Sequence, residues 1–323
     1  EIMLELKGKY TDAKIFIDNV EDGLFEQIYS VINSQAADGL KVRIMPDAHI
    51  GAQICVGFSM ELGKMISPNW CGVDIGCGLV TGSFSKDYKL DLAELDSEIR
   101  KRIPMGFEVH TQTQFKVIPF DEVQKVADIF TKNYNEKFRT SYSSPTYSEK
   151  WLTKKLKDID MDADKFWKSI GTMGGGNHYC EVGVSENTGK YWITFHSGSR
   201  NFGLKIADYW NNVAAGRVTV ASDEYNKELN DILMNTFPKN LIPSKLKELK
   251  DKYKMGINKE YLSGDNMMGY LYDMIFAQQY ALWNRTTMLN IVKDILNIKK
   301  FDEVINTIHN YVDFNDFVIR KGA

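Results

Sequence analysis

The sequence predicts an α+β protein in which helices surround a mixed β-sheet core. Two observations lead to this fold class. Short apolar runs bounded by glycine, asparagine or serine have the length and composition of strands, and segments with helical apolar spacing lie between these runs. Strands interleaved with helices are typical of α/β or α+β proteins, and we expect the second, with the chemically active residues on strand ends and loops.

Each element is predicted from its local pattern. The apolar spacing i, i+3, i+4 predicts helices over 21–34, 90–103, 120–138, 149–158 and 202–215, and mostly over 222–300. We expect strands at 13–17 and 79–84, and a strand that runs into a polar turn within 42–49. A hairpin is expected from 179–184 and 191–196, with its turn at 187–189. One side of a long helix is expected to face the core through Met267, Leu271, Met274, Ile275, Gln278, Ala281 and Leu282.

Composition excludes some classes of protein. The 323 residues are 43% hydrophobic and 26% charged, which is ordinary for a globular chain, and the length allows one large domain or two smaller ones. The net charge of −3 does not indicate a nucleic-acid partner, so such a partner would need a local basic patch. No stretch has transmembrane length or a secretory pattern, so we expect no membrane partner. The spacing of the four cysteines favours reduced thiols and a cytoplasmic location.

The stretch 72–78, GVDIGCG, places a carboxylate and a thiol three residues apart among glycines. In a strand or a turn at a strand end, Asp74 and Cys77 can both reach one metal ion or a pair of ions. The alternative is a buried strand with one structural cysteine, since free cysteine is among the most buried residue types. The other candidate ligands decide between the two.

Three of the five histidines lie in unusual local settings. His178 follows three glycines and an asparagine, His196 ends a predicted strand, and His309 precedes Asn310. Each histidine alone is more often a core residue, but all three together with Asp74 and Cys77 predict a metal site. Thiolate, imidazole and carboxylate favour zinc, with manganese or cobalt as alternatives, and five ligands are enough for two ions.

Two further stretches have the chemistry of phosphate binding. The backbone amides of GGGN at 174–177 can contact a phosphate, although a plain flexible turn has the same composition. In SGSR at 197–200, Arg200 places a permanent cation beside His196, and a guanidinium matches phosphate geometry. The alternative is a surface arginine that caps a loop.

Several of these motifs, in this order, resemble those of the RtcB family of RNA-splicing ligases. The matching motifs are MPDAHIG at 45–51, GVDIGCG at 72–78, GGGNH at 174–178, HSGSR at 196–200, HN at 309–310 and RKGA at 320–323, with the Asn284-Arg285 pair between them. These motifs are long and rare, and they span most of the chain. The resemblance implies a single compact domain over residues 1–323.

The resemblance also implies the chemistry. It predicts a GTP- and manganese-dependent ligase that joins a 2′,3′-cyclic phosphate or 3′-phosphate RNA end to a 5′-hydroxyl end through an RNA-3′-pp-G end. A histidine is first guanylylated, GMP then moves to the 3′-phosphate, and the 5′-hydroxyl attacks with release of GMP. The implied partners are such RNA ends and an activating protein of the kind that some relatives use.

The family motifs assign roles to individual residues. The implied ligands of two manganese ions are Asp74, Cys77, His178, His196 and His309, with Cys77 as the bridge. Asn177, Glu181 and Asn310 are expected to bind the guanine nucleotide. Arg200 is expected to hold an RNA phosphate, and Lys321 to act beside it in the active site.

One feature of the family is missing from this sequence. The guanylylated histidine of the family follows the RKGA motif, whereas this sequence ends at Ala323. We therefore expect a chain that is C-terminally incomplete relative to the family and does not form the GMP adduct by itself.

Two other functions fit part of the pattern. A metal-dependent phosphoesterase that opens cyclic phosphates needs the metal ligands and Arg200 but no guanylylated histidine. A non-catalytic RNA-binding module would use the lysine-rich segments 154–157 and 245–254, although these lysines alternate with apolar residues as on solvated amphipathic helices.

Overall fold

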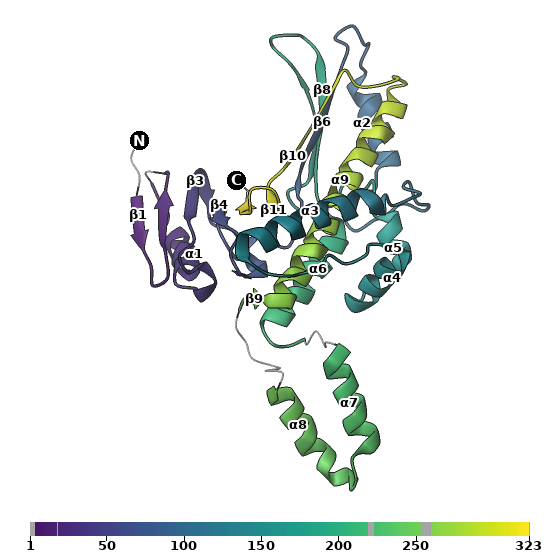
Figure 1. Ribbon diagram of the computed structural model, residues 1–323. Coiled ribbons are helices and arrows are strands. Elements are labelled where there is room, and N and C mark those ends of the chain that lie inside the picture. The colour runs from purple at the N-terminus through teal and green to yellow at the C-terminus, as the bar shows by residue number, and fades with distance from the viewer. Residues whose placement is uncertain (1–3, 18, 219–222, 253–259, 323) are drawn as a thin grey trace.

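Two β-sheets and one long helix form the centre of the molecule. The computed structural model describes residues 4–17, 19–218, 223–252 and 260–322. Within these ranges the chain has mixed sheets surrounded by helices, which confirms the predicted α+β class. The long helix α9 (Gly264–Ile295) contacts strands of both larger sheets and runs diagonally through Figure 1.

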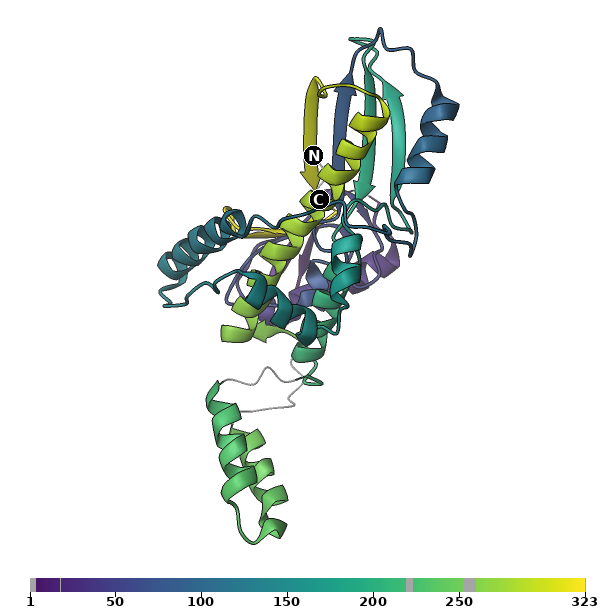
Figure 2. The same cartoon turned by 90° about the vertical axis from the view of Figure 1, so that its right-hand side faces the viewer.

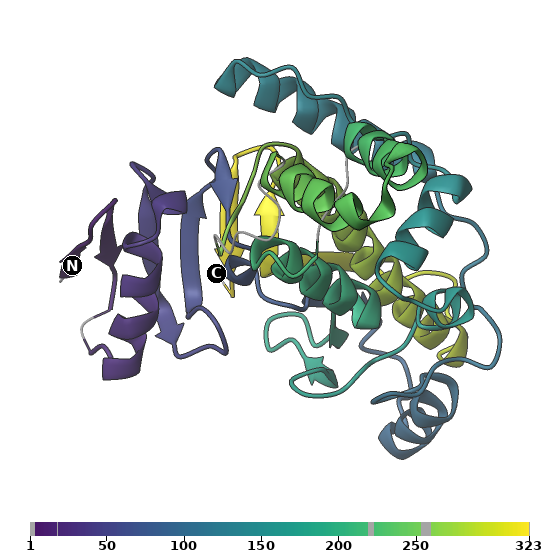
Figure 3. The same ribbon diagram turned by 90° about the horizontal axis from the view of Figure 1, so that it is seen from below.

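The first sheet has six strands, four from the N-terminal part of the described chain and two from its C-terminal part. Its spatial order is β1 (Leu4–Lys7), β2 (Asp12–Ile15), β3 (Val42–His49), β4 (Val56–Glu61), β12 (Val318–Lys321) and β11 (Asn310–Asp313). Only β2 and β3 pair in parallel, and helix α1 (Asp22–Ile32) lies in the connection between them. The view from below in Figure 3 shows β1 at the outer edge and most helices on the other side.

The second sheet has four strands, all antiparallel, in the order β10 (Glu303–Ile308), β6 (Gly78–Phe84), β8 (Tyr191–Ser197) and β7 (Tyr179–Val184). The predicted hairpin is confirmed as β7 and β8. Val80, Ile193 and Phe195 bury one face of this sheet against α9 and against α2 (Leu92–Arg102). Alternation along the strands turns Thr81, Thr194 and Glu181 to the opposite face.

Helix α9 is buried on all sides along most of its length, and not only on one side as the sequence predicts. Met267, Leu271, Met274, Ile275 and Ala281 are buried as expected. Helix residues on the other sides are buried as well, among them Tyr270, Phe276, Tyr280 and Trp283. The reason is that α9 lies between the sheets and the other helices, and a helix surrounded by protein needs no polar face.

Other helices cover the part of α9 nearer its N-terminus (Figures 1 and 2). These are α3 (Phe120–Phe138), α4 (Glu149–Asp158), α5 (Ala163–Lys168) and α6 (Arg200–Ala214). The bounds of α3 and α4 are the predicted ones, whereas α6 begins two residues earlier than expected. Ser199 directly precedes α6, and Arg200 therefore lies in the first turn of this helix.

The region expected to be mostly helical over 222–300 is interrupted. Helices α7 (Asp223–Asn235) and α8 (Ile242–Lys252) form a hairpin that extends away from the body (Figure 2). Residues 219–222 and 253–259 lie outside the described ranges.

Strand β9 (Leu262–Ser263) pairs with β5 (Met65–Ile66), and single 3₁₀ turns lie at Gln35–Ala37, Pro68–Trp70 and Lys239–Leu241. Among the described helices, none has the length and apolarity needed to span a bilayer.

Candidate metal centre

The segment that carries Asp74 and Cys77 is a turn, which settles the choice between strand and turn that the sequence leaves open. The turn ends where β6 begins, directly after Cys77. Two backbone hydrogen bonds fix it: Gly76 N donates to Asn310 O at 2.7 Å, and His309 N donates to Cys77 O at 2.9 Å. The turn is thereby attached to the chain between β10 and β11.

Strand register brings the three histidines to the same end of the four-stranded sheet. His196, the second-last residue of β8, lies opposite Tyr179 of β7 and Leu79 of β6. His178 directly precedes Tyr179, and His309 directly follows the last residue of β10. Antiparallel strands place the end of one beside the start of the next, so residues far apart in sequence meet here.

Five donor atoms converge at this end of the sheet. Cys77 Sγ lies 3.2 Å from His196 Nε2 and 3.5 Å from His178 Nε2. His178 Nε2 is 2.8 Å from Asp74 Oδ2, and His196 Nε2 is 3.1 Å from His309 Nε2. The atoms form two groups, each with its ligand atoms within 4.8 Å of one another, and Cys77 belongs to both. One group adds Asp74 and His178, the other His196 and His309.

A backbone carbonyl determines the tautomer of His196. Its Nδ1 lies 2.9 Å from Asn177 O, and a carbonyl oxygen only accepts, so Nδ1 carries the hydrogen. The lone pair of neutral His196 is then on Nε2, which faces Cys77 and His309. An imidazole oriented in this way by its other nitrogen is typical of metal-bound histidine. His178 Nδ1 is buried without a hydrogen-bond partner in the part of the chain that the structure describes.

In the absence of a metal ion, the surroundings of the site favour neutral His196 and His309 and a protonated Cys77 thiol. Burial lowers the pKa of His309 to about 4, with the charges of His196 and Lys321 acting in the same direction. Burial also lowers the pKa of His196. Burial and the adjacent Asp74 carboxylate raise the pKa of Cys77, so its thiolate needs a nearby cation. Burial alone would raise the pKa of Asp74, but the hydrogen bond and the charge of His178, together with Cys77 and the charge of Arg200, outweigh burial and lower this pKa.

The donor set fits metal ions. The edge of a tetrahedron with metal–ligand bonds of about 2.0–2.3 Å is about 3.3–3.8 Å long. The separations of Cys77 Sγ from His196 and His178, 3.2 and 3.5 Å, are close to this range. Two lone pairs that point at each other, as on Cys77 and His196, also repel unless a proton or a cation lies between them.

Helix α9 holds the two backbone segments of the site through a pair of buried polar residues. Arg285 Nη1 donates to Gly76 O at 2.6 Å and to Ser197 O at 3.0 Å. Asn284 Nδ2 donates to Gly198 O at 3.0 Å, and Asn284 Oδ1 accepts from Thr172 N at 3.0 Å. Sequence reasoning assigned no role to this pair. The signal was two adjacent polar residues within an apolar helix.

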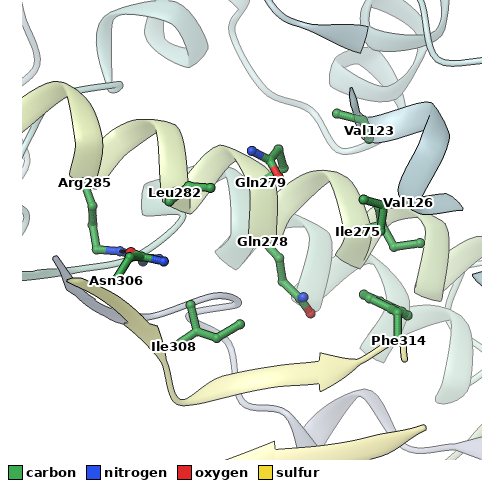
Figure 4. A pocket seen from close by; sticks show the side chains of 10 residues that line it. All are labelled: Val123, Val126, Ile275, Gln278, Gln279, Leu282, Arg285, Asn306, Ile308 and Phe314. Carbon is green, nitrogen blue, oxygen red and sulfur yellow. Dashed lines mark hydrogen bonds between the residues drawn. The ribbon is translucent and has the colours of Figure 1, made fainter. Parts of the chain in front are cut away.

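Figure 4 shows the side of α9 that carries Arg285. The guanidinium Nε donates to Asn306 Oδ1 of β10 at 3.0 Å, and the two side chains lie together in the figure. They line one end of a small pocket of about 160 Å³. Gln278 lies further along α9 and bonds both backbone groups of Val312 in β11, at 3.1 and 3.3 Å. Polar side chains of α9 therefore contact both sheets.

Arg200 lies beside Asp74 and is fixed by two hydrogen bonds. Its Nε donates to Thr172 Oγ1 at 3.1 Å, and its Nη2 donates to Gly106 O at 3.2 Å. The guanidinium packs on Gly174, where a Cβ would clash with it. Glycine is therefore required at 174. The loop that the sequence predicts to bind phosphate packs against the guanidinium of Arg200.

Lys321 of β12 and Asn310 of β11 both lie against the turn. Lys321 Nζ donates to Asn310 Oδ1 at 3.2 Å, and Asn310 Nδ2 donates to Asp74 O at 3.3 Å. The Asn310 side chain is buried and contacts the turn, while Asn177 and Glu181 are exposed. A nucleotide contact of all three residues stays a prediction.

Fold and site together define an α+β protein with a cluster of side chains that could hold metal ions, beside a half-buried arginine. Comparison with known proteins agrees with the sequence motifs. The sequence model of the tRNA-splicing ligase RtcB family matches residues 30–323, so the chain belongs to the RtcB family.

Curated relatives share this name. The chain is 28% identical over 305 residues to the RNA-splicing ligase RtcB of Escherichia coli strain K12, which covers 87% of this chain and 64% of that protein. It is 27% identical over 243 residues to RNA-splicing ligase RtcB homolog 1 of Entamoeba dispar, covering 63% of this chain and 45% of that protein. A tRNA-splicing ligase RtcB of Pyrobaculum aerophilum is 28% identical over 190 residues, or 51% of this chain and 39% of its own length. The chain thus spans slightly less than two thirds of the E. coli relative.

Proposed function

We propose that this protein is a GTP- and manganese-dependent RNA ligase. Its substrates are a 2′,3′-cyclic phosphate or 3′-phosphate RNA end and a 5′-hydroxyl end, joined through an RNA-3′-pp-G end. The observation that carries the proposal is the cluster of five donor atoms around Cys77, beside Arg200, in a chain of the RtcB family. Family membership supports the reaction class, and the cluster supports metal-dependent phosphoryl chemistry.

Two ions fit the cluster, with Cys77 as the shared ligand. Asp74 and His178 complete one group, and His196 and His309 complete the other. Bound divalent ions would neutralise phosphoryl charge and lower the pKa of an attacking hydroxyl group. A thiolate and three imidazoles favour zinc by their softness, so the choice of manganese rests on the family. Competition between the two metals in a binding assay distinguishes them.

The cations of the site have separate tasks in this proposal. Arg200 is held by Thr172 and Gly106 beside Asp74, where its guanidinium would bind the 3′-phosphate and orient it toward the cluster. Lys321 lies close to Gly72 of the turn, and its ammonium group would neutralise charge on the phosphate that leaves with GMP. Both charges are fixed before substrate binds, which reduces the reorganisation that the reaction needs.

Exposed polar groups beside the cluster would bind the guanine nucleotide. The carboxylate of Glu181 lies on the same face of the sheet as His196, and a carboxylate can accept two hydrogen bonds from the edge of guanine. Asn177 is exposed next to His178, where its side-chain amide would contact a phosphate or the ribose. Asn310 would act through the turn that it supports.

A test of this proposal starts from an RNA strand that already carries 3′-pp-G. This substrate bypasses guanylylation of a histidine and isolates the final sealing step. With manganese and a 5′-hydroxyl strand, the chain should seal the ends and release one GMP for each joint. The variant C77A should not seal, whereas C180A, which removes a thiol from β7 outside the cluster, should do so. Sealing by C77A at the wild-type rate would contradict the proposal.

The same preparation tests the phosphoesterase alternative. Incubation of a cyclic-phosphate RNA end with manganese and without GTP would yield a 3′-phosphate if the cluster opens cyclic phosphates. Opening without any sealing of the activated strand would favour the phosphoesterase.

We further propose a cytoplasmic location, where Cys77 stays reduced, and regulation by an activating protein, as in some relatives.

A further inference from the structure

A cavity of about 530 Å³ opens next to the metal cluster. Asp74 and Arg200 line one part of it, and Val73, Phe107, Val109 and Leu204 form apolar walls. Val73 and Leu204 are more than one third exposed, so the walls are an apolar surface that is open to solvent. An apolar cavity with a few fixed charges is the usual form of a small-ligand site, and this volume lies within the typical range.

Phe107 is the most unusual residue of this cavity, because its side chain is completely exposed, at 108% of the reference area. It lies at the tip of a turn in which Glu108 N donates to Met105 O at 3.2 Å. Two more bonds fix the turn to the site: Gly106 N donates to Gly174 O at 2.8 Å, and Arg200 donates to Gly106 O. The backbone therefore holds an uncovered aromatic ring in a defined position beside the active-site arginine.

We propose that this cavity binds the 3′-terminal nucleoside of the RNA strand, with its base stacked on Phe107. The inference rests on the proposed function, which places the 3′-phosphate of that strand at Arg200. A nucleoside attached to a phosphate at Arg200 enters the cavity that this arginine lines. Stacking on an aromatic ring accepts any base, as expected for a site that recognises an RNA end and not a sequence.

The charges at the cavity agree with this orientation. Arg200 and Lys165 are the cations among its lining residues, and both can meet the negative charge of a phosphate. Glu108 lies next to Phe107 and places a carboxylate at the rim, which repels phosphate and leaves this side to the base. An apolar peptide would leave Arg200 without an anion, so a nucleotide fits the whole surface better than a protein segment.

The test uses a short RNA with a 3′-phosphate and the fluorescent base 2-aminopurine at its last position. Stacking quenches this fluorophore, so binding to the wild-type protein with manganese should quench it. In F107A the quenching should be lost and the Kd should rise roughly tenfold, the fold-change expected from losing one stacked base. F107Y should restore both. Because Phe107 is fully exposed in the described part of the chain, its removal should leave the folded state intact.

A matched control removes another exposed phenylalanine. Phe237, between α7 and α8, is 73% exposed and does not line the cavity. F237A should bind and quench as the wild type does. Equal Kd and equal quenching for wild type and F107A would overturn the inference. Quenching that appears only when 2-aminopurine is at the first position of the 5′-hydroxyl strand would also overturn it, by assigning the cavity to the other strand.

Binding and sealing measurements distinguish failure of the proposed function from failure of the proposed subsite. If the protein binds and quenches the 3′-end but never seals the activated strand, the subsite stands and the ligase proposal falls. If the wild type seals and F107A seals equally well at all RNA concentrations, the ligase proposal stands and the subsite falls.

Discussion

The guanidinium of Arg285 donates a hydrogen bond of 2.6 Å to the carbonyl of Gly76, the residue directly before Cys77. The same Nη1 atom donates a hydrogen bond of 3.0 Å to the carbonyl of Ser197, the residue directly after His196. One buried nitrogen therefore bridges the segments that carry Cys77 and His196. Helix α9 sets the separation of these two donors although it contributes no donor atom to the cluster.

This bridge predicts that Arg285→Lys weakens metal binding. A lysine ammonium keeps the charge but cannot span Asn306 and both carbonyls as the planar guanidinium does. We expect the manganese Kd to rise about 10- to 100-fold, as for other residues that orient ligands. Titration calorimetry measures it, with circular dichroism as a check on folding. Arg100→Lys, on the exposed surface of α2, is the control, and an unchanged Kd in folded R285K would contradict the role.

Gly198 should be intolerant of any side chain. A Cβ at this position would overlap the carboxylate of Asp74, whose Oδ1 also accepts from Ser199 N at 3.2 Å. Gly198→Ala should therefore displace Asp74 and remove one of the two manganese ions of the proposed site, measured as metal-to-protein ratio after dialysis. Gly183→Ala is the matched control, because a Cβ there meets open space. Full metal content in G198A would show that Asp74 is not a ligand.

The buried ion pair between α4 and α9 should be important for stability. Lys155 Nζ is 2.7 Å from Asp273 Oδ2, which also accepts from Trp210 Nε1 at 2.7 Å. Asp273→Ala leaves a buried ammonium and an unpaired indole N–H, so we expect a loss of about 3–5 kcal/mol in the free energy of unfolding. Lys154→Ala breaks the exposed pair with Asp158 and should cost less than about 1 kcal/mol. Urea denaturation compares the two, and similar losses would contradict the argument.

The depressed pKa of His309 predicts an acid-sensitive metal-free protein. Folding lowers this pKa from its ordinary 6.5 to about 4, so the unfolded state binds the proton more tightly. Stability from this group is complete above pH 6.5 and is lost as pH falls toward 4. Between pH 7 and pH 5 the loss should be about 2 kcal/mol. In metal-free H309Q this part of the pH dependence should be absent, and an identical dependence in both proteins would disprove the assignment.

Local sequence patterns predicted the elements that have a strong local signal. The bounds of α3 and α4 agree with the apolar spacing, and the hairpin of β7 and β8 follows from its central turn. The motifs also brought together the five residues that converge in the structure. Glycine-bounded carboxylate, thiol and imidazole groups are rare enough for the sequence to indicate a shared site before their positions are known.

Elements whose partners lie far away in sequence were not predictable in this way. Strand β12 pairs with β4, more than 250 residues earlier, and neither run is long enough to be recognised alone. The all-round burial of α9 depends on both sheets packing on it, which its own spacing does not reveal. Phe107 resembles an ordinary apolar residue in sequence, and only the turn that exposes it beside Arg200 makes it a binding candidate.

The most direct test of the central claim is the absorption spectrum of the protein with cobalt(II) in place of the native metal. A cobalt–thiolate bond gives an intense near-ultraviolet charge-transfer band. The account predicts this band in the wild type and in C180S, and its loss in C77S, because Cys77 is the only cysteine in the described metal cluster. In H309Q the band should persist with altered intensity, since one of two ions loses a ligand. A wild-type spectrum without the band, or an unchanged band in C77S, would contradict a metal centre built around Cys77.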